Sequence, residues 1–312
     1  MHEAEAALRA SRLGLLLDDS NITDITYNGD KIFYVSSLEG RKYYQQWCKK
    51  EALNLIRQIA NMTNQLFTYQ NPILDVVFSC YRLSAIHPLI GRDTNDNAVS
   101  FALRIASTNK DLLVETQTVT DKITSILSHL LKTKRSIVIS GQTGVGKTEL
   151  QKYMLGLLAD HTRVVVIDQG VELATTKLIY PFLDLTFWRY ENKLNDSSLT
   201  NLIKTSLRFN PDYVVIAEAR GEEIIDIYNA TLSGHPSVFT IHSENETLIY
   251  ERMLAMTSYK VPLKHEDLIR VFPYIIHLTK DKRGNKIIRK IKCIVTYEQD
   301  SHKATYLYND ET

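Results

Sequence analysis

The 312-residue sequence contains three cysteines, almost no net charge and no N-terminal apolar stretch long enough to cross a bilayer. Cys48, Cys80 and Cys293 are far apart and form no C-x-x-C pair. This argues against a structural zinc site and predicts reduced thiols that act as small buried hydrophobic residues. Met1 to Leu17 carries acids where a signal peptide is basic, and its apolar part is too short for a transmembrane helix. We therefore expect a cytoplasmic protein.

The charge balance limits the expected partners. Lys and Arg number 37 against 36 Asp and Glu, so no strong net field attracts nucleic acid or an anionic bilayer. We expect no specific nucleic-acid binding, although local basic patches stay possible. The length and the 44% share of hydrophobic residues predict about two globular domains, each with its own core. The predicted division is an N-terminal α+β domain at residues 1–106, a linker at 107–118 and a C-terminal domain at 119–312.

The N-terminal part mixes helical and strand patterns. Ala4–Leu17 and Lys49–Met62 show the apolar spacing of helices, and Asn28-Gly29 is the preferred two-residue turn of a hairpin. Further strands are predicted at Val76–Phe78, Tyr81–Ile86 and Val99–Ile105. These patterns predict a small α+β unit.

The C-terminal part alternates apolar runs with helical patterns. Strands are predicted at Ile137–Ile139, Arg163–Asp168, Tyr213–Ala217 and Val238–Ile241, and helices at Val119–Leu131, Leu199–Phe209 and Gly221–Leu232. Such alternation predicts a mainly parallel sheet with helices on both faces. Near the C-terminus, a strand, a turn at Arg283–Asn285 and a second strand predict an antiparallel edge of the sheet.

The segment Arg135–Leu158 carries the strongest motif of the sequence. Gly141, Gly146, Lys147 and Thr148 meet the pattern G-x-x-x-x-G-K-[ST] between an apolar strand and an amphipathic helix. In such a loop the glycines let backbone N–H groups surround a phosphate, the lysine reaches the β- and γ-phosphates, and the threonine hydroxyl ligates Mg²⁺. The predicted ATP-binding residues are Gly141, Thr143, Gly144, Val145, Gly146, Lys147, Thr148 and Glu149. The alternative is a glycine-rich turn between core elements.

Two acids and a histidine complete the predicted site. Glu218 follows an apolar strand directly, where parallel sheets place ligands, and it is the second predicted metal ligand beside Thr148. Glu172 follows another strand and is close enough in the sequence to swing toward the γ-phosphate. If the strand that ends in His242 lies beside the strand before Glu218, the two side chains emerge at one edge. The alternatives are a solvated acid at a strand end for Glu218 and a surface acid for Glu172.

Four ordered motifs resemble the hexameric traffic ATPases of type II and type IV secretion, and most closely the peripheral type IV secretion ATPase. ISGQTGVGKTE is similar to the family's Walker A, IDQGVEL to its Asp box, LRFNPDYVVIAEARGEE to its Walker B segment and LSGHPSVFTIHSEN to its His box. The resemblance implies a RecA-like ATPase domain, a smaller N-terminal domain and a homo-hexameric ring. It implies that ATP and Mg²⁺ are the cofactors.

The same resemblance assigns roles by position. It implies that Lys147 binds phosphate, that Glu172 is the acid proposed to activate water, that Glu218 is the Walker B acid and that His242 is the terminal His-box residue. Arg82 and Arg104 match two arginines of the N-terminal domain that reach the γ-phosphate. Exposed arginines also form surface ion pairs, which is the alternative for both.

Several functions are compatible with these patterns. The main hypothesis is a motor that hydrolyses ATP and drives secretion or conjugation machinery at the cytoplasmic face of the inner membrane, with peripheral attachment. The alternatives are a pilus retraction motor and a nucleotide-gated docking scaffold with slow turnover. A helicase-like role is the weakest hypothesis, because the charge balance indicates no groove that follows a nucleic-acid strand.

Overall fold

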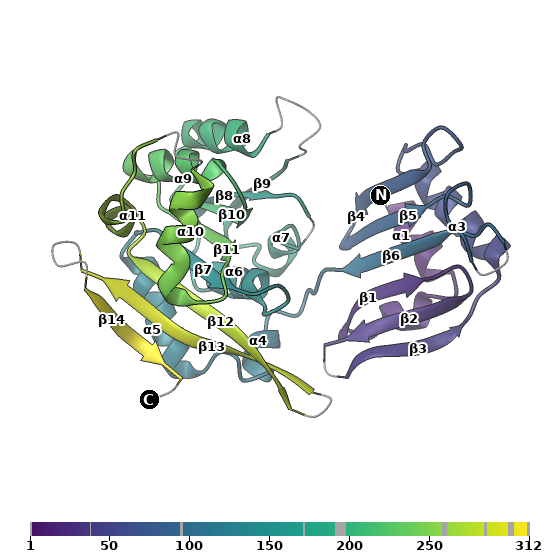
Figure 1. Cartoon of the computed structure of the whole chain (residues 1–312), viewed down its shortest axis with the longest axis horizontal. Helices are drawn as coiled ribbons and strands as arrows, with labels where there is room; N and C mark the ends of the chain where they lie inside the picture. The colour runs from purple at the N-terminus through teal and green to yellow at the C-terminus, as the bar shows by residue number, and fades with distance from the viewer. Residues whose placement is uncertain are drawn as a thin grey trace. The chain divides into compact units, whose positions relative to one another are not determined.

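The computed structural model describes residues 2–37, 39–93, 96–170, 172–190, 198–257, 261–283, 286–298 and 303–310. The chain forms two compact units, whose elements are labelled in Figure 1. The first unit comprises Met1–Asn109 with two short later segments, Gly170–Thr175 and Lys282–Ile287. The second comprises Lys110–Gln169, Thr176–Asp281 and Ile288–Thr312. Each unit has its own sheet and its own hydrophobic core.

The first unit is a six-stranded antiparallel sheet covered by helices. In spatial order the strands are β3 (Gly40–Gln46), β2 (Lys31–Ser36), β1 (Ile22–Tyr27), β6 (Ser100–Ile105), β5 (Tyr81–Ile86) and β4 (Ile73–Phe78). The helices are α1 (His2–Arg9), α2 (Gly14–Leu17) and α3 (Lys49–Met62), and α1 packs against α3. Every second residue of β5 is buried, beginning with Tyr81, which is the period expected of a strand with one face on the core.

Most predictions for the first unit are confirmed, two are wrong, and one strand was missed. The hairpin at Asn28-Gly29 and the helix Lys49–Met62 are present. The single helix predicted at Ala4–Leu17 is two helices, because the Ser11 hydroxyl donates to the Leu8 carbonyl and accepts from the Leu13 N–H, which competes with helical bonding. Strand β3 was not predicted, since its polar residues lie largely exposed. Cys48 is exposed rather than buried.

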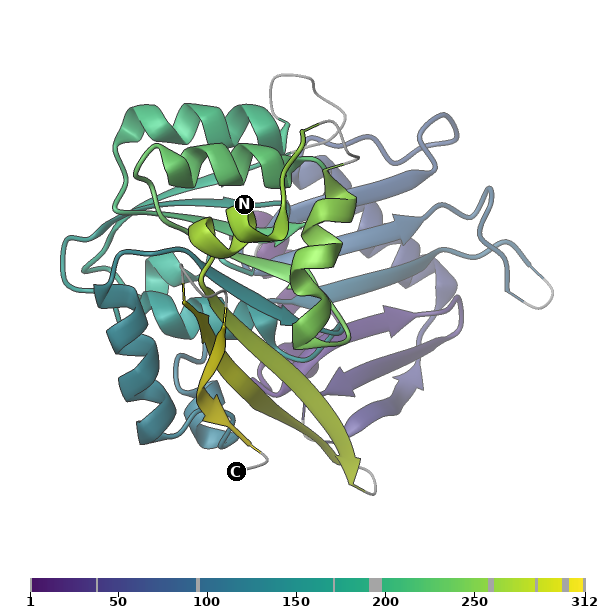
Figure 2. The ribbon, with the colours of Figure 1, turned by 60° about the vertical axis from the view of Figure 1, so that its left-hand side comes forward.

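The second unit contains an eight-stranded sheet. In spatial order its strands are β14 (Ala304–Asn309), β13 (Lys286–Tyr297), β12 (Tyr274–Arg283), β7 (Ile137–Gly141), β11 (Ser237–His242), β10 (Tyr213–Ala219), β8 (Arg163–Asp168) and β9 (Asp184–Arg189). The run from β12 to β9 is parallel, and β13 and β14 pair antiparallel. Strands β12 and β13 are the two long yellow-green strands in Figure 2, beside the shorter β14.

Helices cover both faces of this sheet. They are α4 (Leu112–Glu115), α5 (Asp121–Lys132), α6 (Lys147–Leu155), α7 (Thr176–Ile179), α8 (Leu199–Ser206), α9 (Glu223–Leu232), α10 (Ile249–Met256) and α11 (His265–Val271), with 3₁₀ turns at Leu207–Phe209 and Glu246–Leu248. Successive residues of β10 point to opposite faces. Val214 and Ile216 pack in one core with residues of α8 to α11, whereas Tyr213 and Val215 face α5 and α6. The predicted fold class, a RecA-like α/β domain preceded by a smaller α+β unit, is confirmed.

The edges of the second sheet confirm part of the prediction. The two predicted C-terminal strands are the neighbours β12 and β13. Strand β12 pairs parallel with β7, and the antiparallel edge includes a further strand, β14. Strands β9 and β14 were not predicted because edge strands carry little buried apolar surface, and most of β14 is exposed. Of the predicted turn Arg283–Asn285, Arg283 is the last residue of β12, and Gly284 and Asn285 lie outside the described residues.

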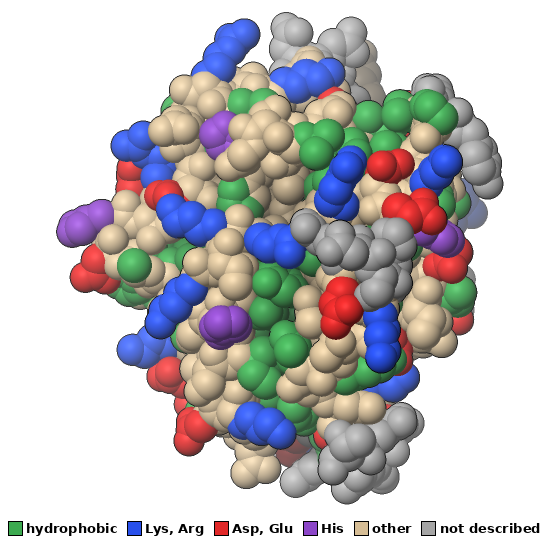
Figure 3. Space-filling view, turned by 90° about the vertical axis from the view of Figure 1, so that its left-hand side faces the viewer, with side chains coloured by type: hydrophobic (Ala, Val, Ile, Leu, Met, Phe, Trp, Pro, Cys, Tyr) green, Lys and Arg blue, Asp and Glu red, His purple; other side chains and the backbone are tan. Residues whose placement is uncertain are grey.

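The surface shows no concentration of one charge on the face drawn in Figure 3. Basic and acidic side chains are interspersed there, with exposed hydrophobic side chains between them. Among the residues that the structure describes, no helix has the length and apolar character needed to cross a bilayer.

Candidate functional site

The glycine-rich loop joins β7 to α6 at the carboxyl edge of the second sheet. Gly141, Gly144 and Gly146 all have positive φ, at 145°, 75° and 98°. A Cβ on Gly141 would collide with the Leu278 carbonyl of the neighbouring strand, and Gly146 caps α6 in the left-handed region. The Val145 side chain is buried, while Thr143 and Gly144 are exposed. The loop therefore presents backbone N–H groups and the N-terminus of a nine-residue helix to solvent.

Lys147 occupies the centre of this loop. Its ammonium donates to the carbonyls of Gly141 (2.9 Å) and Gln142 (3.1 Å) and to Nδ1 of His242 (3.0 Å). The residue is only 7% exposed, and burial lowers its pKa to about 8, although the nearby Glu218 carboxylate acts in the opposite direction. The carbonyl oxygens are weak partners for a desolvated cation. An anion entering the loop would give Lys147 a stronger partner.

Glu218 and His242 meet beside the lysine. The His242 Nε2 lies 2.8 Å from Oε1 of Glu218, and Arg220 Nη2 donates to the other carboxylate oxygen at 2.7 Å. Because Nδ1 of His242 accepts from Lys147, its Nε2 carries the proton and donates to Glu218. Burial, followed by the charge of Lys147, lowers the His242 pKa, so the imidazole is neutral near pH 7. Lys147, His242, Glu218 and Arg220 thus form one continuous hydrogen-bonded network.

The sheet topology explains why these residues meet. Strands β7, β11 and β10 are successive parallel neighbours, and His242 pairs with Gly141 in the register. The loop after β7 and the ends of β10 and β11 therefore lie at one edge. The prediction that His242 and Glu218 emerge together is confirmed. Their roles in chemistry stay predictions.

The residues at this edge have the chemistry that a magnesium nucleotide requires. Thr148 lies in the first turn of α6, and its hydroxyl and the Glu218 carboxylate are hard oxygen ligands of the kind Mg²⁺ prefers. When bound, Mg²⁺ would neutralise charge on the phosphate oxygens. The Glu149 carboxylate forms an ion pair with the buried ammonium of Lys152 at 2.9 Å, on the same helix.

Glu172, Arg82 and Arg104 lie in the first unit. Arg82 and Arg104 are direct partners across β5 and β6, so two guanidinium side chains lie on one face of the antiparallel sheet. Each has an acid beside it: Arg82 donates to both oxygens of Asp75, at 3.2 and 2.9 Å, and Arg104 pairs with Glu172 at 3.0 Å. Their proposed roles toward a phosphate stay predictions.

Two basic residues near the loop were missed by sequence reasoning. Lys280 of β12 donates to the Thr143 carbonyl at 2.7 Å, and Arg289 of β13 donates to the Gly144 carbonyl at 3.0 Å. Their strands were predicted, but no motif marks these positions. The signal is the pairing of β12 with β7, which places Leu278 opposite Gly141 and brings the residues that follow beside the loop.

The amino-acid sequence is similar to those of known proteins. The family model described as type II/IV secretion system protein matches residues 93–288. An uncharacterized protein of Bacillus anthracis is 30% identical over 303 residues, which are 91% of this chain and 66% of that protein. The type IV secretion system protein VirB11 of Bartonella henselae is 22% identical over 280 residues, 77% of this chain and 78% of that protein.

A solved structure supports the same fold. The ATPase DotB of Legionella pneumophila matches with a TM-score of 0.68 at 19% identity, over 91% of this chain and 79% of that one. The chain spans between 40% and 66% of the length of the first curated relatives that it matches.

Proposed function

The chain belongs to the type II/IV secretion system protein family, and we propose that it is an ATPase that powers type IV secretion or conjugative transfer. The observation that carries the proposal is the network of Lys147, His242 and Glu218 at the mouth of the glycine-rich loop. The network supports the proposal because it holds one buried cation and one carboxylate, bridged by His242, beside a loop that is suited to bind phosphate. The VirB11 relative, which is a type IV secretion system protein by name, supports the choice of system.

In the proposed mechanism, the loop N–H groups and the N-terminus of α6 bind the phosphates of ATP. Lys147 exchanges its carbonyl partners for phosphate oxygens, and Thr148 and Glu218 would hold Mg²⁺. Water attacks the γ-phosphorus, the bond to the β-phosphate oxygen breaks, and ADP and phosphate leave. The water proton passes to a carboxylate, either Glu218 or Glu172. His242, neutral and bonded to both Lys147 and Glu218, senses the loss of the γ-phosphate.

The proposal extends to assembly and location. We propose a homo-hexameric ring bound peripherally at the cytoplasmic face of the inner membrane, where it contacts components of the secretion or conjugation machinery. Arg82 and Arg104 act as γ-phosphate ligands in this proposal. An arginine pair suits the role because each planar fork stays charged and can grip phosphate oxygens in a bidentate way. Hydrolysis removes their partner and permits domain motion.

The proposed function is tested by turnover and particle mass, measured together on the purified chain. We expect Mg²⁺-dependent release of phosphate from ATP, abolished by a chelator, and a particle of six 35.8 kDa chains by light scattering with ATP present. An assembled ring that binds ATP without steady-state hydrolysis would instead indicate the docking scaffold. Absence of nucleotide binding would overturn both functions.

The depressed pKa of Lys147 predicts a pH dependence of nucleotide binding. In the ligand-free protein the ammonium loses its proton near pH 8, and phosphate oxygens favour the charged form, so binding raises the pKa. Below that pH binding involves no proton uptake by Lys147. Above about pH 8, ATP binding takes up a proton, and the affinity falls about tenfold per pH unit. Titration calorimetry in two buffers of different ionisation enthalpy measures the uptake.

The matched control for this pH dependence is Lys147→Arg, because a guanidinium stays charged over the whole range. We expect no proton uptake by that variant, whatever its affinity. A wild-type affinity that stays constant between about pH 7 and pH 10 would contradict the assignment of Lys147 to the phosphate.

A further inference from the structure

Strand β10 carries a bulge directly before the candidate site. Ile216 is opposite Phe239 and Ala219 is opposite Ile241, so β10 advances one residue more than β11 over this interval. Glu218 lies inside the interval. A bulge changes which way the following side chains point and leaves backbone groups of the ladder without their usual partners. The direction of the Glu218 carboxylate therefore depends on how the bulge is held.

Two side chains donate hydrogen bonds to backbone carbonyls in and beside this interval. The Gln151 amide of α6 donates from Nε2 to the carbonyls of Ile216 (2.9 Å) and Val238 (3.3 Å), one on each strand of the interrupted pair. The Thr240 hydroxyl of β11 donates to the Ala217 carbonyl at 2.6 Å. Strand β10 thus accepts one hydrogen bond from α6, the helix that follows the glycine-rich loop, and one from the neighbouring strand β11.

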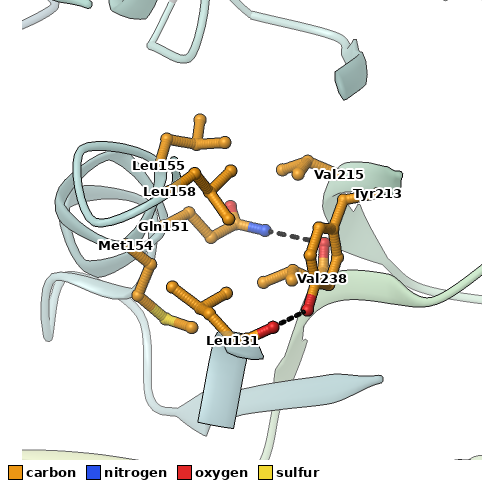
Figure 4. Close-up of a pocket in the computed structure, with 8 residues that line it drawn as sticks. All are labelled: Leu131, Gln151, Met154, Leu155, Leu158, Tyr213, Val215 and Val238. Atoms are coloured by element: carbon orange, nitrogen blue, oxygen red, sulfur yellow. Dashed lines mark hydrogen bonds between the residues drawn. The ribbon is translucent and has the colours of Figure 1, made fainter. Parts of the chain in front are cut away.

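The placement of Gln151 is unusual for an amide. It is 1% exposed and lies in the apolar layer between α6 and the sheet. Figure 4 shows it among side chains of α5, α6, β10 and β11, with a dashed line for its hydrogen bond to Val238 of β11. Its Oε1 has no partner among the described residues. Gln151 lines a cavity of about 10 Å³ together with Leu131, Met154, Leu155, Leu158, Tyr213, Val215 and Val238. Since a buried amide is unfavourable in such surroundings, its two donated bonds account for its presence.

Helix periodicity connects Gln151 to the phosphate loop. Gln151 follows Lys147 by four residues, one turn along the same face of α6. Lys147 reaches Glu218 through His242, and Gln151 reaches the β10 backbone two residues before Glu218. Two successive turns of α6 are thus linked to β10. The first link runs from Lys147 through His242 to Glu218, and the second is the Gln151 amide.

We propose that Gln151 is a positioning residue for Glu218: by holding the carbonyls of Ile216 and Val238 it keeps the bulge formed and aims the carboxylate at His242. Its effect on turnover rests on the proposed ATPase function. Its effect on the bulge does not. Thr240 acts with it from the other strand.

The test compares Gln151→Met, which preserves length and burial but donates no hydrogen bond, with two other variants. We expect Gln151→Met to lower kcat about tenfold or more while ATP affinity stays within about threefold, because the misdirected group acts on the chemical step. Thr240→Val removes the hydrogen bond to the Ala217 carbonyl and should also lower kcat. Met154→Ala is the matched control. Met154 lines the same cavity from α6, but its thioether donates no hydrogen bond, so the change should lower the melting temperature and leave kcat unchanged.

A double-variant cycle separates positioning from general destabilisation. In a Glu218→Gln background, Gln151→Met should lower the residual kcat by less than about twofold, because the group that it positions is gone. An equal loss in both backgrounds, or wild-type kcat in Gln151→Met and Thr240→Val, would overturn the inference.

Hydrogen exchange tests the effect of Gln151 on the bulge independently of any measurement of ATP hydrolysis. Fragments covering β10 should exchange faster in Gln151→Met than in Met154→Ala or the wild type, and unchanged exchange would overturn the inference. If the wild-type ring hydrolyses no ATP, the proposed function fails, while faster exchange confined to β10 still supports the tie between Gln151 and the bulge.

Discussion

Lys147→Ala is expected to abolish measurable ATP hydrolysis and to weaken nucleotide binding. Lys147 is the only basic residue of the loop Gly141–Thr148, and it is buried with its ammonium on two loop carbonyls and His242. In this desolvated place, one charge stabilises phosphate oxygens far more than it would in water. Loss of one such group lowers kcat by about 10²- to 10³-fold. Phosphate release in steady state and fluorescence titration with a nucleotide analogue measure the two effects.

Lys134→Ala is the matched control for this variant. Lys134 belongs to the same unit and pairs with Asp212 at the surface, where its side chain is 67% exposed. A surface ion pair contributes about 0–1 kcal/mol, so turnover and melting temperature should stay near the wild-type values. If Lys147→Ala retained wild-type turnover, the glycine-rich loop would not be the site of hydrolysis.

The architecture of the second unit was predictable because its signals are local. Apolar runs such as Arg163–Asp168 are strands buried on both faces, and they alternate with helical patterns in the way a parallel sheet requires. The loop itself was predictable for the same reason, since the glycines and Lys147 follow each other within eight residues of sequence. Strands, helices and loops that are encoded within one short segment can therefore be predicted from a single sequence.

The contacts that complete the site depend on register between distant strands. Lys280 and Arg289 reach the loop only because β12 pairs with β7 and β13 lies next to β12, which no local pattern records. The bulge in β10 is equally invisible, because the run from Tyr213 to Ala217 has the composition of a regular strand. Gln151 therefore looked like an ordinary polar position on a helix. Its role emerges from the two carbonyls to which its amide donates, one on each of the two strands.

Glu218→Gln is expected to bind ATP and to hydrolyse it about 10²- to 10⁴-fold more slowly than the wild type. The amide preserves the shape of the side chain but removes the negative charge that accepts from His242 and Arg220 and that holds Mg²⁺ in the proposed mechanism. It also removes a nearby charge that favours the ammonium of Lys147. Nucleotide affinity by calorimetry and single-turnover hydrolysis separate binding from chemistry.

The comparison with Glu172→Gln assigns the proton acceptor between the two acids. Glu172 pairs with Arg104 in the first unit, so its loss leaves the network of Lys147, His242 and Glu218 intact. If Glu172 takes the water proton, both amide variants lose hydrolysis, and Glu172→Gln retains normal Mg²⁺ dependence of binding because it is not the metal ligand. If Glu218 performs both tasks, Glu172→Gln turns over normally. Glu251→Gln, an exposed acid of α10 at 52% exposure, is the neutral control, and normal hydrolysis by Glu218→Gln would place the essential carboxylate elsewhere.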